Sequence, residues 1–134
     1  MEHTLVLIKP DAFEKGLVGR ILSLYEDNGL KIQNCYVTIP TTEILERHYA
    51  EHVGRSFYPS LVDFMASGKV LAIHLSGEKA IERVRQINGR TNPAKADAGT
   101  IRFLYGTDVQ RNAVHGSADP ADAARELAIW FPDK

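Results

Sequence analysis

Four short β-rich stretches alternate with segments of helical spacing along this chain, and the alternation restricts the folds that it can adopt. Each stretch holds apolar or β-branched side chains over a few residues and ends at proline, glycine or a change of spacing. The pattern predicts an α+β fold: a ferredoxin-like βαββαβ sandwich whose four-stranded antiparallel sheet is covered by helices. We expect the helices on one face of the sheet, and the strands at residues 4–8, 30–39, 70–75 and 113–115.

The segments between the strands carry helix start and stop signals. An Asn-Gly pair closes two of them, and Asp119 followed by Pro120 is a strong helix start. Thr41 or Thr42 is suited to cap another helix, with Glu43 in its first turn. The expected helices run from Val18 to Asn28, from Thr42 to His52, from Pro59 to Ser67, from Gly77 to Asn88 and from Asp119 to Phe131.

Residues 90–112 contain Gly, Pro, Asn, Thr and Asp and show no clear periodicity. A structureless run of about twenty residues inside a compact domain is usually functional or mobile. This one carries basic and hydroxyl side chains, among them Thr91, Arg102 and Arg111. The sequence therefore favours a binding loop over a linker.

The size and charge of the chain disfavour several classes of function. Its 134 residues suit a single domain over residues 1–134, and no repeat or low-complexity tract divides it. A formal net charge of -1 gives no general attraction to nucleic acid or to an anionic membrane, so we expect neither as a partner. An anionic ligand would need a local cluster of basic side chains.

The sequence shows no feature of a secreted or membrane protein. Cys35 is the only cysteine, which excludes an internal disulfide and fits a reducing compartment, and we expect it as a small core residue in a strand. Glu2 stands where a signal peptide needs basic residues, and no run approaches the ~20 apolar residues that span a bilayer. We therefore expect a soluble, cytoplasmic protein.

The common phosphate-binding and hydrolase motifs are absent. Residues 67–69 contain the Gly-Lys pair of a P-loop, but Asp63 occupies the position of its first glycine. No GxGxxG, GxSxG or HExxH motif occurs. His48 and His52 are spaced to hold a metal on one helix, yet no cysteine or carboxylate set obviously completes the site, and a partly exposed helix face is the simpler interpretation.

The hexapeptide NAVHGS, residues 112–117, is the segment most informative about chemistry. It places His115 at a strand end beside a glycine, which lacks a Cβ and lets a bulky ligand approach the ring. A neutral imidazole is a competent nucleophile near neutral pH once a partner such as Ser117 or Glu126 fixes its tautomer. A structural histidine at a strand end fits the same six residues.

Basic and hydroxyl side chains elsewhere can supply a phosphate cradle. Lys9 follows a buried strand, so its ammonium can sit at the sheet edge beside a phosphate, while Asp11 fits a cap of the following turn better than a ligand. Arg85, Thr91 and Arg102 flank the irregular loop, and phosphoryl transfer needs positive charge and hydrogen bonds around the equatorial oxygens. Viewed singly, these basic residues also fit solvated surface positions.

Taken together, these segments resemble the nucleoside diphosphate kinase family. The resemblance extends from Thr4 to Phe131. It implies the ferredoxin-like fold, a homo-oligomer, and transfer of the terminal phosphate of a nucleoside triphosphate, mainly ATP, to nucleoside diphosphates by a ping-pong mechanism. The matching motifs are IKPD at 8–11, HY at 48–49, RSF at 55–57, TNPA at 91–94, GTIR at 99–102 and NAVHGS at 112–117.

The resemblance also implies roles for single residues. His115 would be the nucleophile that becomes phosphohistidine, Ser117 and Glu126 would orient it, and Tyr49 would support the site near the phosphates. Asn112 and Lys9 would also contact the ribose 3′-hydroxyl, and Phe57 would stack on any base, since every base has a π-face. The expected nucleotide-binding residues are Lys9, Phe57, Arg85, Thr91, Arg102 and Asn112, with Val109 on the other side of the base.

Mg²⁺ is the implied cofactor, held mainly by the phosphate oxygens of the nucleotide, because this ion keeps several waters and seldom needs a protein cage. The chain departs from many relatives at Ala118, where an acidic residue is frequent, at Ala98, where proline is frequent, and at Phe103-Leu104, where Gly-Asp is frequent. These departures leave the expected nucleophile and phosphate ligands in place. They bear on loop rigidity and subunit contacts, and the oligomer size stays open.

Two other functions are compatible with parts of the sequence. One is a ferredoxin-like nucleotide sensor without turnover, and the other is an interaction protein whose basic loop binds single-stranded nucleic acid. The complete set of expected catalytic residues disfavours the first, and the net charge disfavours the second. The sequence therefore predicts phosphoryl transfer between nucleotides.

Overall fold

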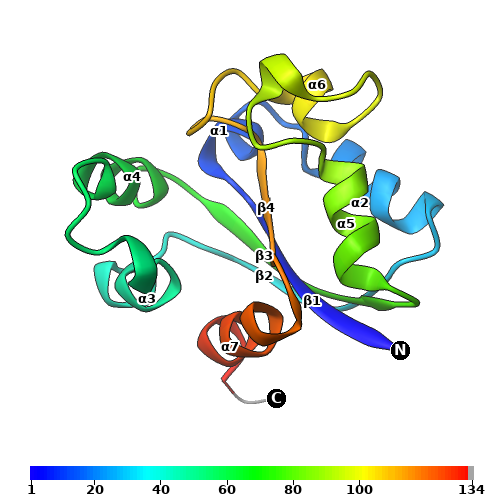
Figure 1. Ribbon diagram of the computed structural model, residues 1–134, viewed down its shortest axis with the longest axis horizontal. Coiled ribbons are helices and arrows are strands. Elements are labelled where there is room, and N and C mark those ends of the chain that lie inside the picture. The colour runs from blue at the N-terminus through cyan, green and yellow to red at the C-terminus, as the bar shows by residue number, and fades with distance from the viewer. Residues whose placement is uncertain (133–134) are drawn as a thin grey trace.

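The computed structural model describes residues 1–132, and its centre is one four-stranded antiparallel sheet (Figure 1). The strands are β1 (Glu2–Ile8), β2 (Lys31–Thr38), β3 (Val70–Gly77) and β4 (Val114–Gly116). They lie in the order β2-β3-β1-β4, so β1 pairs with β3 on one side and with β4 on the other. This order is that of the split βαβ arrangement, and the predicted ferredoxin-like α+β fold is confirmed.

Helices fill the segments between the strands and follow the last one. They are α1 (Pro10–Glu14), α2 (Val18–Asp27), α3 (Thr42–His48), α4 (Tyr58–Met65), α5 (Ala80–Asn88), α6 (Ile101–Tyr105) and α7 (Pro120–Trp130), with 3-10 turns η1 (Ala50–His52) and η2 (Pro93–Lys95). The expected caps form: the Oγ1 of Thr41 accepts the N–H of Ile44, and the Oδ1 of Asp119 accepts the N–H of Asp122. No helix in residues 1–132 combines the length and hydrophobicity that a membrane crossing requires.

Helices cover both faces of the sheet, so the expectation of helices on one face was wrong. On one face, Val6 and Ile8 belong to a buried cluster with residues of α2 and α5. On the other face, Leu5 and Leu7 belong to a second cluster with residues of α3, α4 and α7 (Figure 1). Because β1 and β3 are buried on both sides, their sequences are continuous apolar runs rather than alternating ones.

Residues 90–112 hold more regular structure than their sequence indicates. The Oδ1 of Asn92 accepts the N–H of Ala94 and begins η2, and the Oγ1 of Thr100 accepts the N–H of Phe103 and caps α6. The expectation of a structureless segment was therefore wrong for residues 101–105. A helix of five residues is too short to display a helical period, and only its capping threonine is visible in the sequence.

Two further expectations fail for local reasons. Cys35 is exposed because β2 is an edge strand with alternating burial, and its neighbour Tyr36 occupies the inward position against the second cluster. His48 and His52 do not share an α-helix, because α3 ends at His48 and the 3-10 turn η1 follows. Their i,i+4 spacing therefore does not place the two side chains on one face of an α-helix.

Candidate active site

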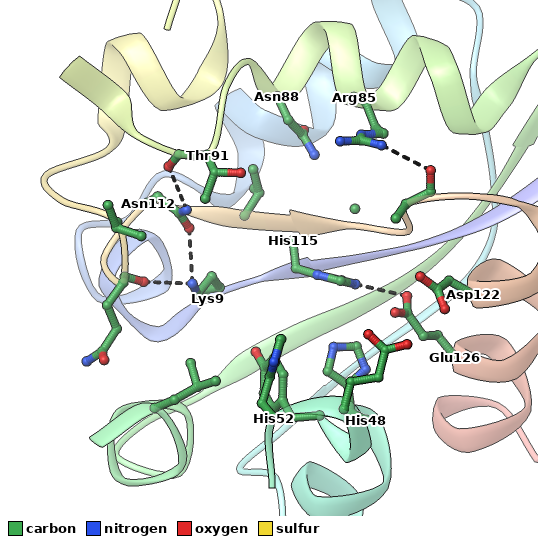
Figure 2. A pocket seen from close by; sticks show the side chains of 18 of the residues that line it. Lys9, His48, His52, Arg85, Asn88, Thr91, Asn112, His115, Asp122 and Glu126 are labelled. Carbon is green, nitrogen blue, oxygen red and sulfur yellow. Dashed lines mark hydrogen bonds and ion pairs between the residues drawn. The ribbon is translucent and has the colours of Figure 1, made fainter. Parts of the chain in front are cut away.

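A pocket of about 660 Å³ lies beside the end of β1 and along β4, with α3 and α4 on one side and α5 on the other (Figure 2). Its wall contains every predicted site residue except Ser117, which is buried behind Glu126. The predicted residues on the wall are Lys9, Tyr49, Phe57, Arg85, Thr91, Arg102, Val109, Asn112, His115 and Glu126. The wall also holds residues for which the sequence indicated no role in a nucleotide site, among them His48, His52, Asn88, Gln110, Asp122 and Arg125.

His115 lies in the middle of β4, opposite Leu7 of β1, and its side chain reaches into the pocket. The side chain is 23% exposed, so solvent and ligands can reach the ring. Its Nε2 is 2.9 Å from the Oε1 of Glu126 (Figure 2), and Nδ1 has no hydrogen-bond partner within residues 1–132. One ring nitrogen is thus held by the protein and the other is left for a ligand.

Glu126 is itself fixed, with 5% of its side chain exposed. The hydroxyl of Ser117 donates to the same Oε1 at 2.8 Å, and the guanidinium of Arg125 lies 3.6 Å from Oε2. The Oγ of Ser117 also accepts the N–H of Leu5 at 3.3 Å. The carboxylate that holds His115 is therefore connected through Ser117 to β1, one of the two inner strands of the sheet.

Gly116 follows His115 for a reason that the sequence did not reveal. A Cβ at this position would lie 2.9 Å from the Cγ1 of Val84 and 2.9 Å from the Nδ2 of Asn88, both on α5. Such distances are shorter than van der Waals contact, so only glycine lets β4 pack this closely against α5. Since Gly116 also lines the pocket, access for a ligand and close helix packing both favour glycine here.

Lys9, Asn112 and Thr91 form a hydrogen-bonded chain along one wall of the pocket (Figure 2). The Nζ of Lys9 donates to the backbone oxygen of Gln110 at 2.6 Å and to the Oδ1 of Asn112 at 3.0 Å. The Nδ2 of Asn112 donates to the backbone oxygen of Thr91 at 3.0 Å. Burial lowers the pKa of Lys9 to about 8, with Arg102 adding to the effect and Asp11 opposing it.

Asp11 does not cap the turn that follows it, so that expectation was wrong. Its Oδ2 accepts the backbone N–H of Ala113 at 3.0 Å, a contact between residues far apart in the sequence. Ala113 has a φ of 74°, a left-handed conformation that is unfavourable for a residue with a Cβ. The carboxylate of Asp11 thus helps hold a strained residue in place between Asn112 and the strand that carries His115.

Arg85 and Arg102 reach the pocket from α5 and α6 and are both anchored to backbone oxygens. Arg102 donates to the backbone oxygens of Gly89 and Val114, at 2.8 Å in each case. Arg85 donates to the backbone oxygen of Ala118 at 3.0 Å (Figure 2). Because a guanidinium carries five N–H donors, each arginine keeps donors for an anionic ligand. The contact at Ala118 uses only its backbone, so it does not depend on the side chain that differs from many relatives.

Two exposed apolar side chains lie on the pocket wall. Phe57 precedes α4 and is 48% exposed, and Val109 is 58% exposed. The ring of His52 packs against Phe57, with centroids 5.3 Å apart. Exposed apolar groups on the wall of a pocket suit a flat aromatic ligand.

The ligand atoms of His48, His115 and Glu126 lie within 4.8 Å of one another, a spacing that a metal ion can use. Each of these side chains already makes hydrogen bonds within the protein, however. The Nδ1 of His48 accepts the Nε1–H of Trp130 at 3.0 Å, and the Oε1 of Glu126 accepts from His115 and Ser117. The arrangement is therefore better described as a hydrogen-bonded network around His115 than as a metal centre.

Comparison with known proteins identifies the family. The family model described as nucleoside diphosphate kinase matches residues 2–134. The chain belongs to the nucleoside diphosphate kinase family. A nucleoside diphosphate kinase of Heliobacterium modesticaldum is 48% identical over 131 residues, covering 98% of this chain and 88% of that protein. One from Caldanaerobacter subterraneus is 45% identical over 133 residues, covering 99% of this chain and 96% of that protein.

Solved nucleoside diphosphate kinases share the fold over nearly the whole chain. The structure from Encephalitozoon cuniculi has a TM-score of 0.95 and 38% identity, covering 98% of this chain and 89% of that one. The structure from Aquifex aeolicus has a TM-score of 0.93 and 41% identity, covering 97% of this chain and 94% of that one. The family that the sequence motifs predicted is thereby confirmed.

Proposed function

We propose that this chain transfers the terminal phosphate of a nucleoside triphosphate to a nucleoside diphosphate, with the Nδ1 of His115 as the nucleophile. The hydrogen bond between Nε2 of His115 and Glu126 is the observation that carries the assignment of this atom. A neutral imidazole has one N–H, and a carboxylate partner places that proton on Nε2. The lone pair then resides on Nδ1, which has no partner within residues 1–132 and faces the pocket.

The reaction divides into two half-reactions at one site. Nδ1 of His115 attacks the terminal phosphorus of the triphosphate, the N–P bond forms, and the P–O bond to the leaving diphosphate breaks. The Nε2 proton stays on the ring, where the carboxylate of Glu126 balances the positive charge that develops. A second diphosphate then attacks the phosphohistidine and regenerates the free imidazole.

The remaining site residues fit the roles that the family resemblance implies. Lys9, Arg85, Thr91 and Arg102 supply cations and a hydroxyl for the phosphates, as loose phosphoryl-transfer transition states require. Asn112 and Lys9 would reach the ribose 3′-hydroxyl, Phe57 and Val109 would enclose the base, and Tyr49 would support the site near the phosphates. Ser117 and Glu126 would orient His115. Because the proposed base contacts are stacking contacts, the site would accept several bases.

Mg²⁺ is the cofactor that we propose, carried by the nucleotide. On the pocket wall, the carboxylates other than Glu126 are Glu51 and Asp122, and Asp122 lies 3.8 Å from the guanidinium of Arg125. These residues fit an ion that keeps its water shell and binds phosphate oxygens, with Asp122 able to accept hydrogen bonds from that water. When bound, Mg²⁺ neutralises charge on the phosphates.

We further propose that residues 1–134 form one domain that acts as a cytoplasmic homo-oligomer. Both apolar clusters share the same sheet, which supports a single folding unit. Exposed apolar side chains at the edge strand β2 and on α6, namely Val37, Phe103 and Leu104, support self-association. Light scattering coupled to size-exclusion chromatography would measure the assembly, and a monomer at working concentration would contradict the oligomer.

A labelling experiment tests the function. Incubation with [γ-³²P]ATP and Mg²⁺ should give an acid-labile, base-stable label on the protein, and a nucleoside diphosphate should remove it. The His115→Ala variant should bind nucleotide and fold normally but take no label. Label retained in that variant would refute the nucleophile, while a parent protein that binds nucleotide without labelling would indicate a sensor. A gel-shift at physiological salt tests the other alternative, binding of single-stranded nucleic acid, and we expect no shift.

A further inference from the structure

His48 is a buried residue of the pocket wall to which the proposed reaction assigns no role. It ends α3, and only 3% of its surface is exposed. Its ring meets the ring of His115 edge to face, with centroids 4.6 Å apart and planes 78° apart. Figure 2 shows the ring of His48 directed toward His115 from the side of the pocket opposite α5.

Trp130 fixes the tautomer of His48. An indole N–H can only donate, and the Nε1–H of Trp130 lies 3.0 Å from the Nδ1 of His48. Nδ1 must therefore carry a lone pair, so the single proton of the neutral ring resides on Nε2. Burial, reinforced by His115 and Arg125, lowers the pKa of His48 well below its usual value and keeps the ring neutral.

The Nε2–H of His48 is a donor without a protein acceptor. Within residues 1–132 the contact with Trp130 is the hydrogen bond that this ring makes, and His48 lines the pocket. A ring nitrogen of His48 lies within 4.8 Å of a ring nitrogen of His115. Because the centroids of the two rings are only 4.6 Å apart, an oxygen of a phosphoryl group on His115 can come within hydrogen-bond distance of the His48 ring.

We propose that the Nε2–H of His48 donates a hydrogen bond to an oxygen of the phosphoryl group while that group is transferred to and from His115. The inference rests on the proposed function of His115. A donor held rigidly by a buried indole is oriented before the reaction begins, and this is the condition under which a hydrogen bond lowers a barrier. A neutral donor also adds no charge to a pocket that already contains Lys9, Arg85 and Arg102.

Two substitutions separate this role from packing. In His48→Asn the amide occupies about the place of Nδ1, so the bond from Trp130 can persist while the Nε2 donor is lost. In His48→Gln the longer side chain brings an amide N–H to about the place of Nε2. His3, an exposed histidine on β1 outside the pocket, supplies the control variant His3→Asn.

The measurement is the single-turnover rate of phosphorylation by [γ-³²P]ATP, with nucleotide affinity and thermal stability determined beside it. We expect His48→Asn to lose at least tenfold in rate, toward the 10²–10³-fold known for loss of one such donor, with nucleotide affinity unchanged. His48→Gln should recover part of the loss and His3→Asn should match the parent. A rate for His48→Asn within threefold of the parent, or equal rates for the Asn and Gln variants, would overturn the proposal.

An NMR measurement on the parent protein needs no variant to fold. With ¹⁵N-labelled histidine, His48 should show a protonated Nε2 and an unprotonated Nδ1, and its Nε2–H proton should move downfield in the phosphoenzyme. The opposite tautomer, or an unchanged proton signal after phosphorylation, would refute the role of His48 alone. A parent protein that takes no label on His115 would refute the proposed function as well, so the two failures are distinct.

Discussion

Replacing Glu126 by glutamine tests the charge that the site places behind His115. The substitution keeps the size of the side chain, and an amide oxygen can still accept from both His115 and Ser117. What it removes is the negative charge. That charge matters most when Nδ1 of His115 bonds to phosphorus, because the ring then carries positive charge while Nε2 still holds its proton.

The expected loss follows from the strength of the hydrogen bond. Bonds to charged groups contribute about 1.5–3 kcal/mol and neutral ones about 0.5–1.5 kcal/mol, so Glu126→Gln should raise the barrier by about 1–2 kcal/mol. At about 1.4 kcal/mol per factor of ten, this predicts a fall of roughly 5- to 30-fold in the phosphorylation rate. Nucleotide affinity should change little, because Glu126 contacts the histidine and not the phosphates in the proposed arrangement.

Rapid-quench measurement of the phosphoenzyme, with calorimetric titration of nucleotide, separates rate from affinity. Glu46→Gln, a carboxylate on the exposed face of α3, is the matched control and should leave both quantities unchanged. A loss of less than twofold in Glu126→Gln would show that the carboxylate only orients the ring. A loss confined to nucleotide affinity would refute the reasoning altogether.

Three further predictions concern the rest of the site. Lys9 carries its charge below its pKa of about 8, so kcat/KM should fall as the pH rises through that value. The fall in kcat should come at higher pH, because bound phosphates stabilise the cation. A kcat/KM that stays level to pH 9 would contradict this prediction. Gly116→Ala should lower the free energy of unfolding in urea by about 1–3 kcal/mol, because the added Cβ overpacks the contact with α5. The control Gly19→Ala lies in a helix with open space around it and should leave stability unchanged or raise it. Equal effects of the two substitutions would refute the packing argument. Phe57→Ala should weaken the binding of nucleotides with every base by about 1–3 kcal/mol in calorimetric titration. Val53 is exposed and lies outside the pocket, so Val53→Ala is the control. An effect of Phe57→Ala no larger than that of the control would exclude stacking.

The sequence predicted the parts of the fold that depend on local pattern. The apolar runs of β1 and β3 and the cap at Asp119 are visible residue by residue, and the structure contains all three. Helix α6 was missed because five residues show no period. The second helical layer was missed because a continuous apolar strand indicates burial without indicating what covers each face.

For the candidate site, too, the sequence indicated which residues take part but not the contacts between residues far apart in the chain. Motif resemblance selected residues that the structure brings to one pocket and suggested partners for His115, but it carried no information about the partners of Lys9 and Asp11. The bond from Lys9 to Asn112 joins positions 103 residues apart, and that from Asp11 to Ala113 joins positions 102 apart. A local capping role was predicted for Asp11 because sequence spacing can reveal only contacts between near neighbours in the chain. His48 was considered with His52 as a possible metal pair and as part of the HY motif, and neither pattern pointed to Trp130.

The hydrogen bonds of the proposed phosphate ligands explain how one pocket can serve both half-reactions. Arg102 is held by Gly89 and Val114, Arg85 by Ala118, and Lys9 by Gln110, in each case through a backbone oxygen. These cations are therefore ordered before any nucleotide arrives, and the entropy of fixing long side chains is lost on folding rather than on binding. A cradle built in this way does not depend on the base or sugar to assemble it. A donor triphosphate and an acceptor diphosphate, which share their phosphate chemistry and differ elsewhere, would meet the same preorganised groups before and after His115 is phosphorylated.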